Sequence, residues 1–211
     1  MRRLVTVLIF LVFLSVGGAL FIFYFPQVWG EALFPYPYRE MFVDAWQKQQ
    51  DKGCNMPRHL PVAVGYVESG HNPQAVSHAG ARGIMQLVPA TAVGLAKKRG
   101  LSDFKVSQLG DAQINILLGT DYLCSVILAA QGDFDEALAR YNLGGRAENR
   151  ALWPRETQGF VRKVKGVLEA YNRIYGPNDE GPIKPFVVEK PKSFLSIISV
   201  TNLFNLLVGQ Q

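Results

Sequence analysis

The sequence predicts an all-α domain in the middle of the chain, and two observations lead to that prediction. Apolar residues recur there at the spacing of one helix face, as at Leu60, Val64 and Val67. No segment of this middle region has the pattern of a strand. At 211 residues, the chain is long enough for one ordinary domain with additional segments at its ends.

Residues 1–30 predict an N-terminal transmembrane anchor. Residues 4–25 carry no charge and would span about 33 Å as a helix, which is enough to cross a bilayer. A cleaved signal peptide usually has a shorter apolar core followed by small residues, whereas bulky aromatic residues follow here. Arg2 and Arg3 favour a cytoplasmic N-terminus. We therefore expect a single-pass protein of a bacterial cell membrane with its domain on the outer side, periplasmic or extracytoplasmic.

Residues 31–52 predict a juxtamembrane spacer followed by a short helix. Two prolines in the run F-P-Y-P-Y fix their own φ angles and keep their predecessors out of the helical region, so this run should be extended. From residue 39, Phe42, Ala45 and Trp46 recur at helical spacing, and Trp46 is expected to face inward.

Residues 53–176 are expected to form the catalytic domain. Its first helix should start with Asn55 as N-cap and Pro57 in the first turn, and the run after Ser69 should end it. A loop follows, in which Gly80 and Gly83 are positions for positive φ or close backbone approach. Gly119 suggests a close helix crossing. Further helices are expected over 91–99, 111–130, 134–141 and 156–175.

Residues 177–193 form a predicted linker, because prolines are spread among charged residues there. The tail at 194–211 is largely apolar and uncharged. It is short for a membrane span, and an interfacial membrane helix, a helix that docks on a partner and a second anchor are the three alternatives for it.

Cys54 and Cys124 fall in the part expected outside the cytoplasm, where disulfides persist. One bridge and two separate buried thiols remain alternatives, since a sequence gives no distance. Neither cysteine belongs to a ligand spacing, and the histidines form none, so we expect no bound metal and no cofactor. The net charge of +5 comes from scattered basic residues, so nucleic acid is not an expected partner.

Glu68 is the strongest candidate for a catalytic group, since it directly follows an apolar helix face and no other acid lies near it in sequence. Burial raises the pKa of a carboxyl, so such a group can act as a general acid near neutral pH. Glycoside hydrolases usually need a second carboxylate. Four other acids could approach only through the fold: Asp103, Asp111, Asp121 and Glu156.

Further segments follow Glu68-Ser69 in a characteristic order. They are G-I-M-Q at 83–86, N-I at 115–116 followed by Gly119, A-L-A-R-Y-N at 137–142 and E-T-Q-G-F-V at 156–161. Over residues 55–171, this set resembles the soluble lytic transglycosylase (SLT) family. The resemblance implies a lysozyme-like helical catalytic domain of the goose type.

The resemblance also implies cleavage of the β-1,4 bond between N-acetylmuramic acid and N-acetylglucosamine in peptidoglycan, without net use of water. Glu68 would protonate the glycosidic oxygen and then, as a base, take the proton of the muramic acid C6 hydroxyl. That hydroxyl would attack C1 and leave a 1,6-anhydro end. One carboxylate would suffice, because the sugar supplies the nucleophile.

By the same resemblance, a set of side chains would line the substrate cleft. Those that can hydrogen-bond sugar or acetamido groups are Ser69, Gln86 and Asn142. Apolar walls would come from Met85 and Tyr141, and Ser77 and Phe160 complete the set. Phe160 stands where the family commonly has Tyr, and Arg140 and Leu143 flank Tyr-Asn where small residues are usual. These departures predict weakened or altered catalysis.

The sequence therefore predicts a membrane-anchored peptidoglycan lytic transglycosylase with glycan strands as substrate. Its other expected partners are the membrane and proteins of the cell envelope. Two alternatives remain at this stage. One is a catalytically weak or inactive peptidoglycan-binding scaffold of an envelope complex, and the other is a lysozyme-type muramidase.

Overall fold

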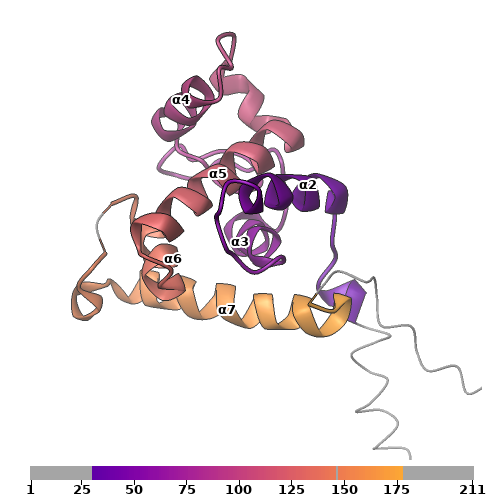
Figure 1. Ribbon diagram of the computed structural model, residues 1–211, viewed down its shortest axis with the longest axis vertical. Helices are drawn as coiled ribbons and strands as arrows, with labels where there is room; N and C mark the ends of the chain where they lie inside the picture. Colours follow the sequence, from indigo (N-terminus) through magenta and orange to yellow (C-terminus); the bar gives the residue numbers. More distant parts are fainter. Residues whose placement is uncertain (1–29, 146, 178–211) are drawn as a thin grey trace, which may run out of the picture.

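The computed structural model of the protein describes residues 30–145 and 147–177, and this part of the chain is built from helices (Figure 1). Two isolated bridges, Val76 with Arg82 and Arg82 with Leu87, are the strand-like pairings among the described residues. The predicted all-α class is confirmed for them. The elements are α2 (Arg39–Gln50), α3 (Leu60–Ser69), α4 (Pro89–Lys98), η1 (Val106–Gly110), α5 (Ala112–Ala129), α6 (Phe134–Leu143), η2 (Arg150–Leu152) and α7 (Arg155–Tyr175).

The predicted anchor up to residue 29, the linker from residue 178 and the tail at 194–211 lie outside the described residues. Within the described part, α5 is the one helix long and apolar enough to cross a membrane by length and composition. Half of it is buried in the domain, where it packs against α2, α4 and α6. A place in the core accounts for its apolar sequence.

α3 lies at the centre of the domain and carries Glu68 on its last turn. Residues 60–65 are all buried, because α2, α5 and α7 pack around them. A helix surrounded in this way is apolar on every side, which explains why its sequence has no polar face. Gly70 ends the helix as predicted, with a left-handed φ of 61° that glycine adopts without strain.

The predicted start of this helix at Asn55 is wrong. The helix begins at Leu60, with Pro61 rather than Pro57 in its first turn. Proline is tolerated there because the first N–H groups of a helix have no partner within the helix. Both prolines fit the same local rule, so sequence spacing alone did not distinguish them.

The apolar side chains form two clusters. The larger joins α2, α3, α6 and α7 around α5, and the smaller joins α4 and η1 to another face of α5. In Figure 1 the α4 region stands apart from the layer formed by α6 and α7, with α5 running between them. This division matters for function, because a cleft opens between the two clusters.

Cys54 and Cys124 form a disulfide, with their Cα atoms 6.0 Å apart. The sequence had left a bridge and two separate thiols as alternatives. The bond ties the segment before α3 to the middle of α5 and closes a separation of 70 residues. In the chain-entropy view, a loop of this size is worth about 4 kcal/mol to the folded state.

The segment predicted as a spacer packs onto the domain. Tyr171 and Tyr175 of α7 donate their hydroxyls to the carbonyls of Pro35 and Phe34, at 2.5 and 2.9 Å. The Tyr36 ring lies edge-on to both α7 tyrosines. The end of the predicted anchor is therefore only a few residues from a fixed point on α7.

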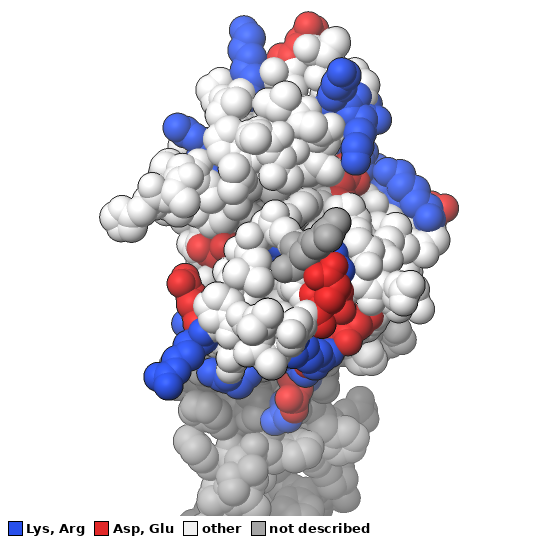
Figure 2. Space-filling view, turned by 90° about the vertical axis from the view of Figure 1, so that its left-hand side faces the viewer, with Lys and Arg blue, Asp and Glu red and all other residues white. Residues whose placement is uncertain are grey.

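Charged side chains are spread over the surface. On the face drawn in Figure 2, Lys and Arg side chains occur from one end of the molecule to the other instead of gathering into one patch. This agrees with the scattered basic residues of the sequence.

Candidate functional site

Glu68 faces a cleft of about 440 Å³ between the two apolar clusters. The cleft walls come from the end of α3, the loop at 77–81, the start of α4 and residues of α5, α6 and α7. Burial raises the pKa of Glu68 from 4.5 to about 7, because desolvation disfavours the carboxylate. Glu68 is therefore a carboxyl that can hold a proton near neutral pH.

Asn115 holds the G-I-M-Q loop beside Glu68. Its amide oxygen accepts the Met85 N–H at 2.7 Å, and its amide nitrogen donates to the carbonyls of Arg82 and Leu109. Asn115 is fully buried, so losing these bonds would leave backbone groups unsatisfied. Gly83 lies against this amide with φ 78°, and a Cβ there would clash with it. The loop thus requires both residues.

The prediction that the Met85 side chain lines the cleft is wrong. It is fully buried, because it packs against Gly119, where a Cβ would collide with the methionine. Its carbonyl accepts the hydroxyl of the cleft residue Tyr141 at 2.7 Å, so Met85 positions a cleft residue from behind. A close helix crossing was predicted at Gly119, but the group that approaches this glycine is the Met85 side chain.

Ser69 also has a structural position instead of the predicted place in the cleft. Its hydroxyl donates to the Ile84 carbonyl at 2.7 Å and accepts the Asn72 N–H at 3.1 Å. These bonds tie the end of α3 to the loop that carries Gln86. Ser69 is absent from the cleft lining because its hydroxyl points into this loop.

Gln86 lies in the cleft lining with a positive φ of 47°. This conformation is unfavourable for a side-chain-bearing residue and recurs at functional sites. The Gln86 amide nitrogen donates to the carbonyls of Ala75 and Gly83, at 3.2 and 2.8 Å, which hold the turn. Its amide oxygen is the group left to face a ligand as an acceptor.

Tyr141 and Asn142 line the cleft together at the end of α6. Burial, the nearby Glu68 and Tyr122 raise the pKa of Tyr141 well above its usual value, so the phenol stays neutral and donates to Met85. The Asn142 amide oxygen accepts the Thr157 hydroxyl at 2.8 Å, which fixes the amide relative to α7. Ser77 lines the cleft from the loop at 77–81, where its hydroxyl accepts the Ala81 N–H.

Phe160 is not among the residues that line the cleft, and its predicted site role stays a prediction. Only 7% of it is exposed, and it belongs to the core with Val161 and Val164. On α7, these residues form the face that points into the domain, whereas Glu156 at the start of the helix reaches the cleft. A phenylalanine fits this apolar position.

Glu156 brings a second carboxylate to the cleft that holds Glu68. The other acids considered from the sequence lie elsewhere. Asp121 pairs with Arg99 and Lys52, and the Asp111 side chain caps α5. Asp103 borders a separate hollow near η1. Glu156 is thus the one of these four that the fold places with Glu68.

Sequence reasoning gave no site role to several other residues of the cleft lining, among them Val88, Tyr122 and Leu143. Asn115, Gly119 and Tyr122 are separated by four and then three residues, so they lie on one face of α5. This spacing could have marked Tyr122 as a residue near the site. Val88 and Leu143 are exposed apolar residues at helix ends, and no local pattern marks such residues as site residues. In the described part of the chain, no group of three His, Cys, Asp or Glu side chains has the arrangement of a metal site.

Comparison with known proteins places the same residues in a known family. The transglycosylase SLT domain matches residues 44–162. The soluble lytic murein transglycosylase of Escherichia coli K12 is 30% identical over 162 residues, which cover 69% of this chain and 24% of that protein. The transglycosylase of Enterobacteria phage PRD1 is 33% identical over 129 residues, covering 61% of this chain and 42% of that protein.

Solved structures give the same result. The 70 kDa soluble lytic transglycosylase of Escherichia coli matches with a TM-score of 0.59 and 29% identity, over 71% of this chain and 26% of that one. Its complex with bulgecin A matches with a TM-score of 0.59 and 27% identity, over 68% and 25% of the two chains. The chain thus spans about a quarter of the length of these soluble transglycosylases.

Proposed function

The chain belongs to the transglycosylase SLT domain family, and from that premise we propose that it is a peptidoglycan lytic transglycosylase. The bond cleaved is the β-1,4 linkage between N-acetylmuramic acid and N-acetylglucosamine. The products carry 1,6-anhydro-muramic acid ends. The observation that carries the proposal is the cleft carboxyl of Glu68, whose pKa of about 7 suits both halves of an acid and base cycle.

Glu68 gives its proton to the glycosidic oxygen as the bond to C1 breaks. The resulting carboxylate then takes the proton of the C6 hydroxyl, whose oxygen bonds to C1 and closes the anhydro ring. The proton count balances, and Glu68 ends the cycle protonated as it began. General acid or base catalysis by one positioned group typically supplies about 10²- to 10⁴-fold in rate.

The other cleft residues position the sugar. The amide groups of Gln86 and Asn142 suit hydrogen bonds to hydroxyl and acetamido groups, and both are fixed by bonds to neighbouring elements. The Ser77 hydroxyl adds a further polar contact from the opposite loop. Tyr141 contributes its ring as a wall, since its hydroxyl is engaged by the Met85 carbonyl.

A lysozyme-type hydrolysis is the second candidate, and the position of Glu156 favours it. A second carboxylate in the same cleft is what a hydrolase uses to activate water or to attack the sugar. Glu156 is exposed in the cleft wall, whereas Glu68 is half-buried. We place transglycosylation first, because the desolvated acid alone completes that cycle.

Digestion of purified sacculi with residues 30–211 tests the proposal. Muropeptides are separated and weighed, and the transglycosylase gives products one water lighter than those of a hydrolase. Glu68→Gln is the control, since it keeps the size of the side chain and removes the proton. Products with ordinary reducing ends would establish the hydrolase, and no release would point to a binding scaffold.

We also propose that the domain lies on the outer side of a bacterial cell membrane, held by residues 1–30. The disulfide between Cys54 and Cys124 supports this, because such bonds persist in oxidising compartments. Protease added to spheroplasts should degrade the domain of the membrane-bound protein. Protection of the domain until the membrane is lysed would contradict this placement.

A further inference from the structure

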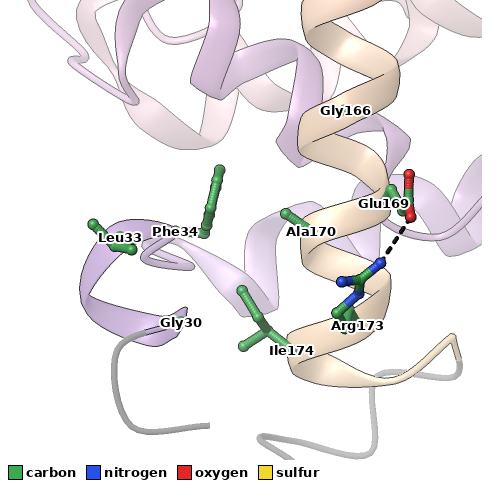
Figure 3. A pocket seen from close by; sticks show the side chains of 8 residues that line it. All are labelled: Gly30, Leu33, Phe34, Gly166, Glu169, Ala170, Arg173 and Ile174. Carbon is green, nitrogen blue, oxygen red and sulfur yellow. Dashed lines mark hydrogen bonds and ion pairs between the residues drawn. The ribbon is translucent and has the colours of Figure 1, made fainter. Parts of the chain in front are cut away.

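An apolar groove of about 370 Å³ lies along α7, well beyond the turn that carries Glu156 (Figure 3). Gly166, Ala170 and Ile174 form its α7 side, and Leu33 and Phe34 form the opposite wall. The groove contains no polar side chain except the Glu169–Arg173 ion pair at its rim, joined at 2.9 Å. It therefore suits an uncharged, apolar ligand.

The shape of the groove favours a helix as ligand. Gly166, Ala170 and Ile174 follow one another at intervals of four residues, so they lie in one row on α7. The two small residues allow a second backbone to approach closely. Leu33 is 54% exposed beside them, so apolar surface in this groove faces water when nothing covers it.

The described chain ends beside this groove. Pro177 follows Ile174 by three residues, and the chain then continues through residues 178–211. The tail includes Val200, Leu203, Phe204 and Leu207, whose spacing is that of one apolar helix face. An apolar stripe of this kind is what binds in a helix-accepting groove.

We propose that the apolar tail at residues 194–208 docks into the groove between Leu33 and α7 of its own chain. Residues 178–193 number 16, and a fully extended chain of that length can span at most about 53 Å. Gly166, the groove residue farthest from the C-terminal end of α7, lies about 14 Å along the helix axis from Tyr175, where α7 ends. The connection is therefore long enough to reach the groove, and attachment to the same chain raises the local concentration of the tail there.

Disulfide trapping in the full chain, reconstituted in phospholipid nanodiscs, tests the proposal. Ala170→Cys is combined with Leu203→Cys, and Gly159→Cys with Leu203→Cys serves as the control. Gly159 lies on the same helix outside the groove, and a Cβ there meets no other atom within 4 Å. Intramolecular bonding should be at least about tenfold faster at position 170, since docking raises the local concentration.

A blocking variant separates docking from random collision. A Cβ at Gly166 also meets no atom within 4 Å, so the side chain of Gly166→Trp starts in open space and its ring should occupy the groove. This change should slow bonding between 170 and 203, whereas Gly159→Trp should leave it unchanged. Leu33→Cys with Leu203→Cys repeats the measurement from the other wall, in case Ala170→Cys affects folding.

Three results would overturn the proposal. Equal rates at 159 and 170 would show that the tail only collides with α7. Bonding between two chains in detergent, with none within a chain, would assign the groove to a second copy. Bonding that occurs in detergent but is lost in nanodiscs would show that the tail prefers the bilayer.

Discussion

The Glu68 cleft and the α7 groove differ in what lines them, not in size. Their volumes are about 440 and 370 Å³. The cleft contains a half-buried acid with a raised pKa and side chains fixed by buried hydrogen bonds. The groove contains apolar carbons and one exposed ion pair. The cleft is suited to acid and base catalysis, whereas the groove is suited to docking of an uncharged segment.

The difference arises from how each region is built. The side chains of Asn115, Ser69 and Tyr141 hydrogen-bond the backbone of Met85 and Ile84, and these bonds hold the cleft loop in place. A preorganised site of this kind holds its acid in place before substrate arrives.

Glu68→Gln should reduce turnover on sacculi by about 10³-fold while glycan binding is kept. The amide cannot donate the proton that the leaving oxygen requires. Rates of muropeptide release and a sacculus pull-down measure the two quantities. A variant that retains a tenth or more of the turnover would remove Glu68 from the catalytic role.

Asn115→Leu should lower the free energy of unfolding by about 3 kcal/mol or more, because the Met85 N–H and two carbonyls lose their buried partner. Denaturant titration of residues 30–211 measures the change. Gln113→Leu, on the exposed side of the same helix, is the matched control and should stay within about 0.5 kcal/mol. Equal effects of the two changes would mean that Asn115 does not hold the loop.

Glu68 should also make the domain less stable as the pH rises. Its folded pKa of about 7 lies above the reference value of 4.5, so the folded state holds the proton after the unfolded chain has released it. The stabilisation is complete below pH 4.5 and is lost as the pH rises through 7. The difference is about 3 kcal/mol, and Glu68→Gln should abolish it.

Unfolding curves at pH 5 and pH 8 measure this effect for both proteins. At pH 8, the glutamine variant should be the more stable of the two, since it has no charge to desolvate. A wild-type protein whose pH dependence is unchanged by Glu68→Gln would contradict the raised pKa. Glu156→Gln, which changes an exposed carboxyl in the same cleft, is the control.

The rate of cleavage should fall about tenfold for each pH unit above 7, because only protonated Glu68 starts the reaction. Initial rates of release between pH 5 and 9, under conditions of low substrate, give this profile. A rate that stays level to pH 9 would show that a group other than Glu68 supplies the proton.

Gly166→Trp should leave turnover within about twofold of the unchanged protein, since Gly166 is exposed and surface changes far from a site have small effects. The groove lies outside the cleft lining, and no residue is shared between them. Sacculus digestion measures the rate. A large loss of turnover would show that the groove affects catalysis in the cleft.

Much of the fold was predictable from the sequence because its signals are local. The apolar periodicity of α5 and α7 and the stop at Gly70 depend on residues within a few turns. Glu68 was identifiable because an acid at the end of a buried helix is unusual. The disulfide was left open, since its two cysteines meet only through the fold.

The errors have a common physical cause. Met85 and Ser69 lie in the recognised segments, yet the Met85 backbone bonds Asn115 and Tyr141, and Ser69 bonds the loop instead of facing the cleft. A motif gives the residues that recur together but does not say which of their atoms face a ligand. For Glu156 the sequence offered no reason to prefer it over the other three acids, because only the packing of α7 brings it into the cleft with Glu68.

In the proposed mechanism the sugar, not water, attacks the cleaved bond. Digestion of sacculi by residues 30–211 in water enriched with heavy oxygen tests this directly, with mass spectrometry of the new chain ends. The account predicts 1,6-anhydro ends that contain no heavy oxygen, at every stage of the digestion. Reducing ends that carry heavy oxygen would contradict it and would assign the attack to a water molecule, with Glu156 as its base.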